Sequence, residues 1–418
     1  MTPEQTPAEH RNGRERPAPG PSFWRFVPLD DYRVPTLPPS GALAKAWATI
    51  RRALRQVEDP SLQPARDEAR LRTLPQIRLD HLVAPLDPAD PADALDAALY
   101  DWCRDDEPRH AVRFVVGQPH DGQREMLPWW AARHGATLIE PPTPAEILAG
   151  DSDTLAQFSA SGPHPDGLWV IPDLARWYLR HSEGLGLVRS LLARAETGEL
   201  GRGVIGCGSW AWAYLSRVWP VPRADALTAQ AFDATRLTRL LTRQVERHPH
   251  RRVHFRHAVT GRDILAVPSD EESPHPEIAQ LAAHCRGNPG TALAYWRESL
   301  RAEPESDAIA TSPDRPGDDF FEEEHIWVSA RLHEPILPNE TDEDVVLVLH
   351  ALLLHDGLPT DLLPELLPLT RDGCLAILLR LDQAGLVARR DDRWQVSPLG
   401  YAGVRALLRG RDYLIDAF

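Results

Sequence analysis

Lysine is almost absent from this chain of 418 residues, since Lys45 is the only one and arginine supplies the rest of the 46 basic side chains. Chemistry that depends on a lysine ammonium is therefore excluded everywhere except near Lys45. Acidic side chains number 61, which gives a formal net charge of −15. This excess of acids argues against a protein that coats nucleic acid or an anionic membrane with its whole surface, although a local basic patch is compatible with it.

Cysteine is also scarce. Cys103, Cys207, Cys285 and Cys374 lie far apart, and neither a C-x-x-C pair nor a histidine at zinc-finger spacing accompanies them. This usage excludes a disulfide framework and a structural zinc site, so we expect no metal. It is typical of a reducing cytoplasm.

Long apolar runs are missing as well. The longest, over residues 345–354, is shorter than the roughly 18 apolar residues that a membrane span requires. The N-terminal residues carry no apolar leader segment. We therefore expect a cytoplasmic protein without a membrane span.

Changes in composition along the chain predict several parts. Residues 1–40 are rich in Pro, Glu and Arg and are predicted to form a disordered tail. Phe23, Trp24 and Phe26 within it form an aromatic motif that either packs on the chain's own core or docks a partner. The other parts are a helical extension over 41–74, an α/β core over 75–250, a helical lid over 251–302, an acidic linker over 303–341 and a winged helix over 342–418.

The part from about 75 to 250 alternates short apolar runs with helical stretches, which is the pattern of an α/β domain with a parallel sheet. The predicted strands are Val112–Val116, Thr137–Ile139, Leu168–Ile171, Gly203–Gly206 and Leu227–Phe232. The predicted helices are Gln123–His134, Pro144–Ala149, Ala175–Thr197, Ala211–Arg217 and Ala234–Arg247. Residues 342–418 follow the order helix, helix, helix, hairpin, helix, which is the order of a winged helix.

Two glycines, Gly117 and Gly122, follow the first predicted strand. Their spacing is that of the phosphate-binding loop G-x-x-x-x-G-K-[ST], whose backbone N–H groups hold phosphates while the Lys and the hydroxyl contact the terminal phosphates and Mg²⁺. Here Gln123 replaces the Lys and Arg124 replaces the Ser or Thr. Lys45 lies too far upstream to supply the ammonium, and an arginine is not equivalent to it.

In proteins with this phosphate-binding loop, a later strand ends in an acid that holds Mg²⁺. Here the strand Leu168–Ile171 is followed by Pro172 and Asp173, so the metal-binding position is lost. Asp173 survives as an acid that could polarise an attacking water.

The lid segment contains Gly287-Asn288-Pro289 followed by an apolar helix. With the loop remnant, the strand before Asp173 and the winged helix, this order resembles the AAA+ and STAND P-loop ATPases, in the branch that includes replication-initiator and origin-recognition proteins. The resemblance covers about residues 75–418. It implies an AAA+-like core with a lid, and a degenerate nucleotide site formed by Gly117, Gly122, Gln123, Arg124, Asp173 and Ser209, the last as a sensor of the terminal phosphate.

Loss of the Lys, the hydroxyl and the strand-end acid removes most of the electrostatic stabilisation that phosphoryl transfer needs. We therefore expect a protein that is not an enzyme and has no cofactor, a pseudoATPase that regulates or scaffolds by binding a protein partner. Nucleotide bound without turnover and an ATPase completed by a partner are the alternatives at this site. An oligomer is compatible with each of them.

Arg236, Arg239, Arg243 and Arg247 fall on one face of the predicted helix 234–247 and form the one concentrated basic surface. They are either a solvated face paired with the acids of 318–324, a contact for phosphate or nucleic acid, or a site for an acidic partner. The predicted wing adds Arg389, Arg390 and Arg393, so a DNA-binding regulator is an alternative function.

Overall fold

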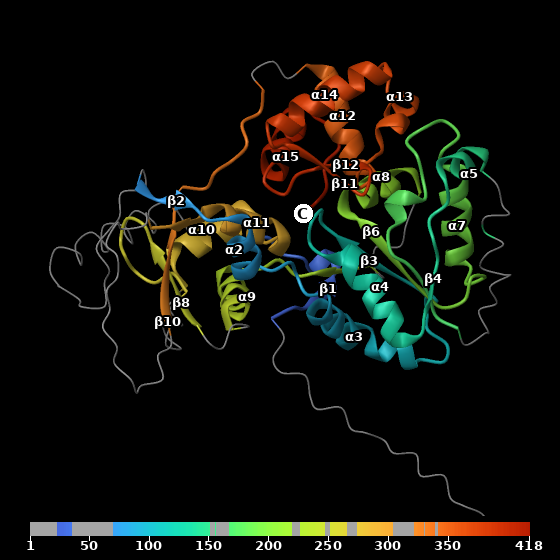
Figure 1. Ribbon diagram of the computed structural model, residues 1–418. Helices are drawn as coiled ribbons and strands as arrows, with labels where there is room; N and C mark the ends of the chain where they lie inside the picture. The colour runs from blue at the N-terminus through green and yellow to red at the C-terminus, as the bar shows by residue number, and fades with distance from the viewer. Residues whose placement is uncertain are drawn as a thin grey trace, which may run out of the picture.

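The computed structural model describes residues 23–35, 70–150, 155, 167–219, 226–246, 251–265, 274–303, 322–329, 331–338 and 342–418. Three groups of elements meet around the C-terminus, which lies near the centre of Figure 1. These groups are an α/β core, a unit built on a second sheet and a C-terminal helical unit.

A six-stranded sheet in the order β1-β7-β3-β6-β5-β4 is the centre of the core. Five of its strands are parallel, as predicted, and β1 pairs antiparallel with β7 at one edge. Their bounds are β1 Phe26–Pro28, β3 Val112–Gly117, β4 Thr137–Leu138, β5 Trp169–Ile171, β6 Gly203–Gly208 and β7 Ala226–Ala229. The central strands are mostly apolar, with Arg113 of β3 as an exception, because helices cover both faces of the sheet.

One face of the sheet packs against α3 (Ala89–Arg104) and α4 (Gln123–His134), and the other against α5 (Pro144–Ala149), α7 (Gly186–Glu196) and α8 (Ser209–Val218). The helix predicted over 175–197 starts late, at Gly186. Before it lie the short 3-10 helix η3 (Leu174–Arg176) and a turn closed by the hydrogen bond from Leu179 N to Gly184 O (3.0 Å). Gly184 approaches the Leu179 backbone too closely to carry a side chain, which breaks the helical pattern.

The second sheet has the order β2-β9-β10-β8 and was not predicted. Its strands are β2 Arg72–Thr73, β8 Arg251–His257, β9 Leu300–Ala302 and β10 Glu322–Val328. The helices α2 (Gln76–Leu82), α9 (Ala234–Glu246), α10 (Pro276–His284) and α11 (Pro289–Ser299) pack with it. The predicted lid and acidic linker are therefore incomplete descriptions, because each contributes strands to this sheet.

The C-terminal unit has its elements in the predicted order. They are α12 (Glu343–Leu354), η5 (Thr360–Leu362), α13 (Leu363–Leu366), α14 (Arg371–Gln383), β11 (Val387–Arg390), β12 (Arg393–Val396) and α15 (Tyr401–Gly410). The apolar helix α12 is buried nearly throughout because it lies between this unit and the core, and its side chains belong to one apolar cluster with those of α7 and α8. Figure 1 shows the unit seated on one side of the core and the second-sheet unit.

The aromatic motif packs on the chain itself. The rings of Phe23 and Trp24 are buried at 6.0 and 4.8 Å from the ring of Phe232, and the half-buried Phe26 opens β1. Residues 23–35, which include β1 and η1 (Leu29–Asp31), are therefore part of the fold and not of a tail. Of the helical extension predicted over 41–74, residues 41–69 lie outside the described residues, and Arg72–Thr73 form the strand β2 and not a helix. Among those that the structure describes, no helix is long and apolar enough to cross a membrane.

Candidate functional site

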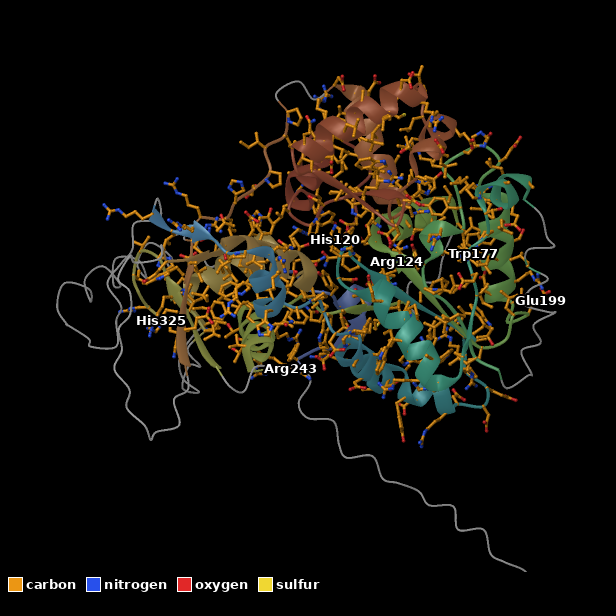
Figure 2. All side chains as sticks on the ribbon, viewed as in Figure 1. His120, Arg124, Trp177, Glu199, Arg243 and His325 are labelled. Atoms are coloured by element: carbon orange, nitrogen blue, oxygen red, sulfur yellow. The ribbon has the colours of Figure 1, made fainter. Side chains whose placement is uncertain are left out.

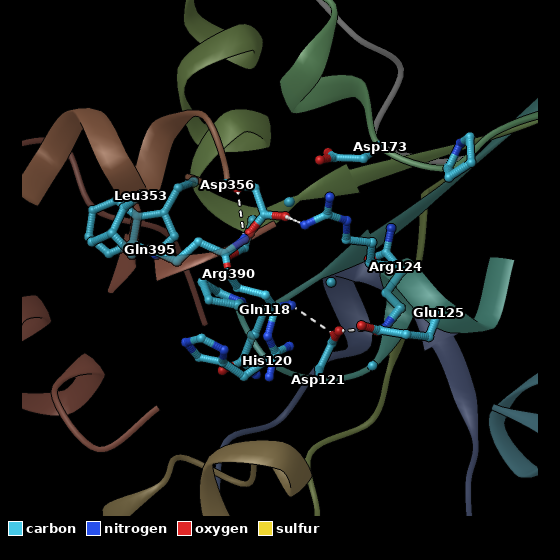
Figure 3. Close-up of a pocket in the computed structure, with 18 residues that line it drawn as sticks. Gln118, His120, Asp121, Arg124, Glu125, Asp173, Leu353, Asp356, Arg390 and Gln395 are labelled. Atoms are coloured by element: carbon cyan, nitrogen blue, oxygen red, sulfur yellow. Dashed lines mark hydrogen bonds and ion pairs between the residues drawn. The ribbon is translucent and has the colours of Figure 1, made fainter. Parts of the chain in front are cut away.

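The residues predicted for the nucleotide site meet in one cleft at the carboxyl ends of the parallel strands, where α/β folds bind ligands. Loop 117–125 follows β3, Asp173 follows β5 and Ser209 follows β6, and all of them line the cleft. The C-terminal unit closes its other side, as Figure 3 shows, with Leu353, Asp356, Arg390 and Gln395. This second wall comes from more than 200 residues downstream of the loop, so local sequence patterns gave no signal for it.

The loop is filled by its own side chains. Asp121 accepts a hydrogen bond from Gln118 N at Oδ2 (2.8 Å) and another from Gln123 N at Oδ1 (2.9 Å). Gln123 turns back into the loop, where its Nε2 donates to Val115 O (2.8 Å). In a phosphate-binding loop such N–H groups hold phosphate oxygens, whereas here a carboxylate takes two of them. Burial raises the pKa of Asp121 to about 7, although both hydrogen bonds act in the opposite direction.

Both loop glycines are required by this filled geometry. A Cβ on Gly117 would overlap with Gln123 Oε1 and Asp121 Oδ2. Gly122 has a φ of 86°, in the left-handed region that favours glycine, and it precedes the first residue of α4. The predicted spacing thus identified a true strand-to-helix loop, but not what fills it.

Arg124 does not enter the loop. Its guanidinium forms an ion pair with Asp356 Oδ2 of the C-terminal unit at 3.7 Å, and Figure 3 shows the two side chains facing each other across the cleft. Both side chains are about one-third exposed, so the pair is a weak electrostatic contact between core and C-terminal unit.

Asp173 caps the helix η3, because its Oδ1 accepts from Ala175 N at 2.9 Å. Its Oδ2 is buried and has no hydrogen-bond partner among the described residues. Burial, together with the nearby Asp356 carboxylate, raises the pKa of Asp173 to about 7. Asp173 thus lines the cleft with one uncommitted carboxylate oxygen, and the Oε1 of Gln123 in the loop likewise has no hydrogen-bond partner among the described residues.

Ser209 is not available as the predicted sensor of a phosphate. It is buried, and its Oγ donates to Asp416 Oδ2 at 2.6 Å. Asp416 also accepts from Tyr401 OH (3.2 Å) and from Arg405 Nε (3.0 Å). The hydroxyl therefore belongs to a buried polar network that fixes the C-terminal residues on the core, and its partner lies 207 residues away in sequence.

The Gly287-Asn288-Pro289 segment holds α11 against the loop. Asn288 Nδ2 donates to Pro119 O at 2.7 Å, and Gly290 approaches the His120 carbonyl too closely to carry a Cβ. This segment therefore lies beside the loop that follows β3.

Two arginines of the predicted stripe on α9 already have partners within the chain. Arg243 pairs with Asp90 Oδ1 at 3.0 Å and lies over the Phe23 ring, and the half-buried Arg236 donates to Ala231 O at 3.4 Å. Arg239 is exposed, and Arg247 lies outside the described residues. Figure 2 shows Arg243 at the edge of the molecule, far from the central Arg124 and His120.

The arginines of the predicted wing lie together at the tip of the β11–β12 hairpin, where Arg390 is opposite Arg393. Arg389 pairs with Asp392 at 2.8 Å, and Arg393 donates to His355 O at 3.2 Å. Arg390 lines the cleft. These residues and the arginine stripe therefore lie at different places on the molecule.

ATP with Mg²⁺ is the cofactor that the fold implies, and the residues present do not fit it. Asp121 takes the loop N–H groups, and positions 123, 124 and 172 lack the ammonium, the hydroxyl and the metal-binding acid. Within the described part of the chain, no three His, Cys, Asp or Glu side chains lie close enough to hold a metal ion.

No protein-family profile and no curated protein matches this sequence. Among solved structures, RuvB of Thermotoga maritima, a Holliday junction branch migration motor, matches 85% of this chain and 99% of its own at 13% identity and a TM-score of 0.32. A Walker-type ATPase of Pyrococcus abyssi matches 76% of this chain and 95% of its own at 13% identity and a TM-score of 0.29. A katanin structure, which concerns the self-assembly of that protein, matches 62% of this chain and 83% of its own at 11% identity and a TM-score of 0.23.

These likenesses are weak, with TM-scores of 0.23 to 0.32, so the AAA+-type fold stays a prediction. One expectation is nevertheless corrected. The expectation that the protein is not an enzyme is withdrawn, because the solved structures that it resembles include one named as a motor and one named as an ATPase. The replication-initiator branch stays a prediction.

Proposed function

We propose that the protein is a regulatory or scaffolding protein of the AAA+ type that binds a protein partner through its C-terminal unit. The observation that carries this proposal is the outward face of α14. Leu375 and Leu379, one helical turn apart, are 39% and 48% exposed on this face. An exposed apolar stripe of this kind is typical of a surface that packs against another protein.

A helix that reads DNA in the major groove presents polar and basic side chains to the bases and the phosphates. On α14, Arg371 is paired with Asp361 at 2.6 Å, and the two acids Asp372 and Asp382 offset the exposed Arg380, so the surface carries no excess of positive charge. These charges favour a protein partner over DNA at this face.

The test is capture of partners from the native cell, followed by mass spectrometry. The double substitution Leu375→Asp and Leu379→Asp should remove the partner, because two charges would be buried in an apolar contact. Ile77→Asp is the matched control, because Ile77 is 84% exposed on α2, a different element. If the same partner is captured undiminished by the α14 variant, the proposal is wrong.

A second candidate is an ATPase whose missing groups a partner supplies. The uncommitted Oδ2 of Asp173, which faces the cleft, favours it. Phosphate release from ATP and Mg²⁺ should then rise above background only when the captured partner is added. Asp173→Ala should reduce that rate by about 10²-fold or more. A rate that is independent of Asp173 would eliminate this candidate.

A further inference from the structure

We propose that the Asp121 carboxylate is the resident ligand of the loop 117–123, an intramolecular anion in the place of a phosphate, and that it controls whether an external polyphosphate binds. The inference rests on the proposed function only in treating the cleft as a place where the protein is regulated. It names Asp121 as one cause of the poor fit of the loop to nucleotide, beside the groups that are missing at positions 123, 124 and 172.

The hydrogen bonds of Asp121 support this role. One oxygen binds the N–H of Gln118 at the start of the loop, and the other binds the N–H of Gln123 at the first residue of α4. The carboxylate therefore spans the loop as a phosphate would, with charge-assisted bonds to N–H groups that include one at a helix N-terminus. The side chain of Gln123 fills the remaining space, and any Cβ at Gly117 would overlap with both.

Buried polar atoms in the same cleft indicate that it can still take a ligand. Asp173 is 9% exposed, and its Oδ2 has no hydrogen-bond partner among the described residues. A buried polar atom without a partner is costly, so native structures seldom leave one unsatisfied. Because the pKa of Asp173 is raised to about 7, this group carries a proton part of the time at neutral pH and can donate it to an anionic oxygen.

Two arginines in the lining of the cleft carry positive charge that would attract an anionic ligand. Arg124 and Arg390 line it from opposite sides, the first on α4 and the second at the end of β11. The contact of Arg124 with Asp356 is long, at 3.7 Å, and open to solvent, so this guanidinium can turn to another anion at little cost. The lining thus offers donors to an anion once the loop N–H groups are free.

The Asp121 carboxylate competes strongly with an external ligand for the loop N–H groups, because it is attached to the same loop. A ligand on the same short segment has an effective concentration in the millimolar range or above, and an external ligand must exceed it. Removing the carboxylate should therefore raise the apparent affinity for a polyphosphate by about tenfold or more.

The experiment titrates the full chain with inorganic pyrophosphate, without metal, by calorimetry. Asp121→Ala should bind at least about tenfold more tightly than the unmodified protein. Glu365→Gln is the matched control, because it removes one negative charge from the first turn of α13, which does not line the cleft. It should change the affinity by less than about threefold, since an exposed charge acts weakly in water.

Three results would overturn the inference: no gain in Asp121→Ala, an equal gain in Glu365→Gln, or tight binding already in the unmodified protein. If Asp121→Ala does not fold, Asp121→Asn serves in its place, because its side chain keeps one acceptor oxygen and loses the charge. Asp121→Asn should then bind more tightly than the unmodified protein, and the absence of any gain counts against the inference. No partner is present in this titration, so its failure is separate from failure of the proposed function.

Discussion

At the scale of single residues, the two carboxyl groups of the cleft should make stability depend on pH. Burial raises the pKa of Asp121 and of Asp173 to about 7, above the value near 3.9 expected in the unfolded chain. Between these values the folded state holds protons that the unfolded state has lost. The free energy of unfolding should therefore fall as pH rises from about 4 to 7, by up to about 1.4 kcal/mol per pH unit for each group.

Asp173→Asn tests this dependence. The amide is neutral at every pH and keeps an oxygen for Ala175 N, so the variant should lose part of the slope and gain stability at pH 8. Urea unfolding at several pH values measures both effects. Asp372→Asn on the exposed side of α14 is the control and should leave the slope unchanged. If the free energy of unfolding of Asp173→Asn depends on pH as steeply as that of the unmodified protein, Asp173 does not have the raised pKa.

The buried pair of Arg405 and Asp416 supports a second prediction. The two side chains are 7% and 3% exposed and bond at 3.0 Å. Arg405→Leu would leave the Asp416 carboxylate buried without its cation, which should cost about 3–5 kcal/mol in the free energy of unfolding. The double variant with Asp416→Leu should recover part of that loss, because no unpaired charge remains. The measurement is chemical denaturation of the two single variants and the double variant. If the two side chains did not stabilise each other, the losses of stability in the single variants would add up in the double variant.

Some residues of the site could be predicted from the sequence, and others could not. The spacing of Gly117 and Gly122 identified the loop, because glycine is required there by φ and by close approach. Asp121 could have been suspected, since an acid directly before Gly122 stands beside a helix N-terminus. Asp416 and Asp356 gave no local signal, because their roles depend on where the C-terminal unit docks.

At the scale of elements, the strongly apolar strands β3, β5 and β6 were predicted to within a residue or two, because burial on both faces leaves a clear pattern. The strands β8 and β10 were missed because one is rich in arginine and the other in glutamate. Their parallel register places Arg251 opposite Glu322 and Arg252 opposite Glu323. Composition alone makes such segments look like a linker, and only the pairing explains them.

The arginines of α9 support a prediction at the same scale. Arg243 is paired with Asp90, which leaves few side chains of the stripe for phosphates. Each neutralised phosphate contributes about −0.9 to the slope of log affinity against log salt, so we expect weak DNA retention near roughly 50 mM salt that is lost by about 200 mM. Filter binding across this range, with Arg239→Glu as the test variant, measures it. Tight retention at physiological salt that Arg239→Glu abolishes would instead favour a DNA-binding regulator.

At the scale of the whole molecule, the C-terminal unit and the core should behave as one cooperative body. Leu349 and Leu352 of α12 are buried in the same apolar cluster as Trp210 of α8. Tyr178 OH donates to Leu354 O at 2.7 Å, which ties the core to the end of α12. An apolar interface that continues a core resembles a permanent contact and not a transient one between domains.

Leu349→Ala tests this cooperativity. The substitution should cost about 2–5 kcal/mol, because it removes buried volume from a side chain with no exposure. Since one core serves both parts, amide hydrogen exchange should accelerate together in β6 and in α14, although neither contains residue 349. Leu379→Ala is the control on an exposed site and should change stability by less than about 0.5 kcal/mol. Faster exchange in α14 with unchanged protection in β6 would mean that the C-terminal unit opens independently, and the closed cleft would then be a state that the protein can leave without unfolding its core.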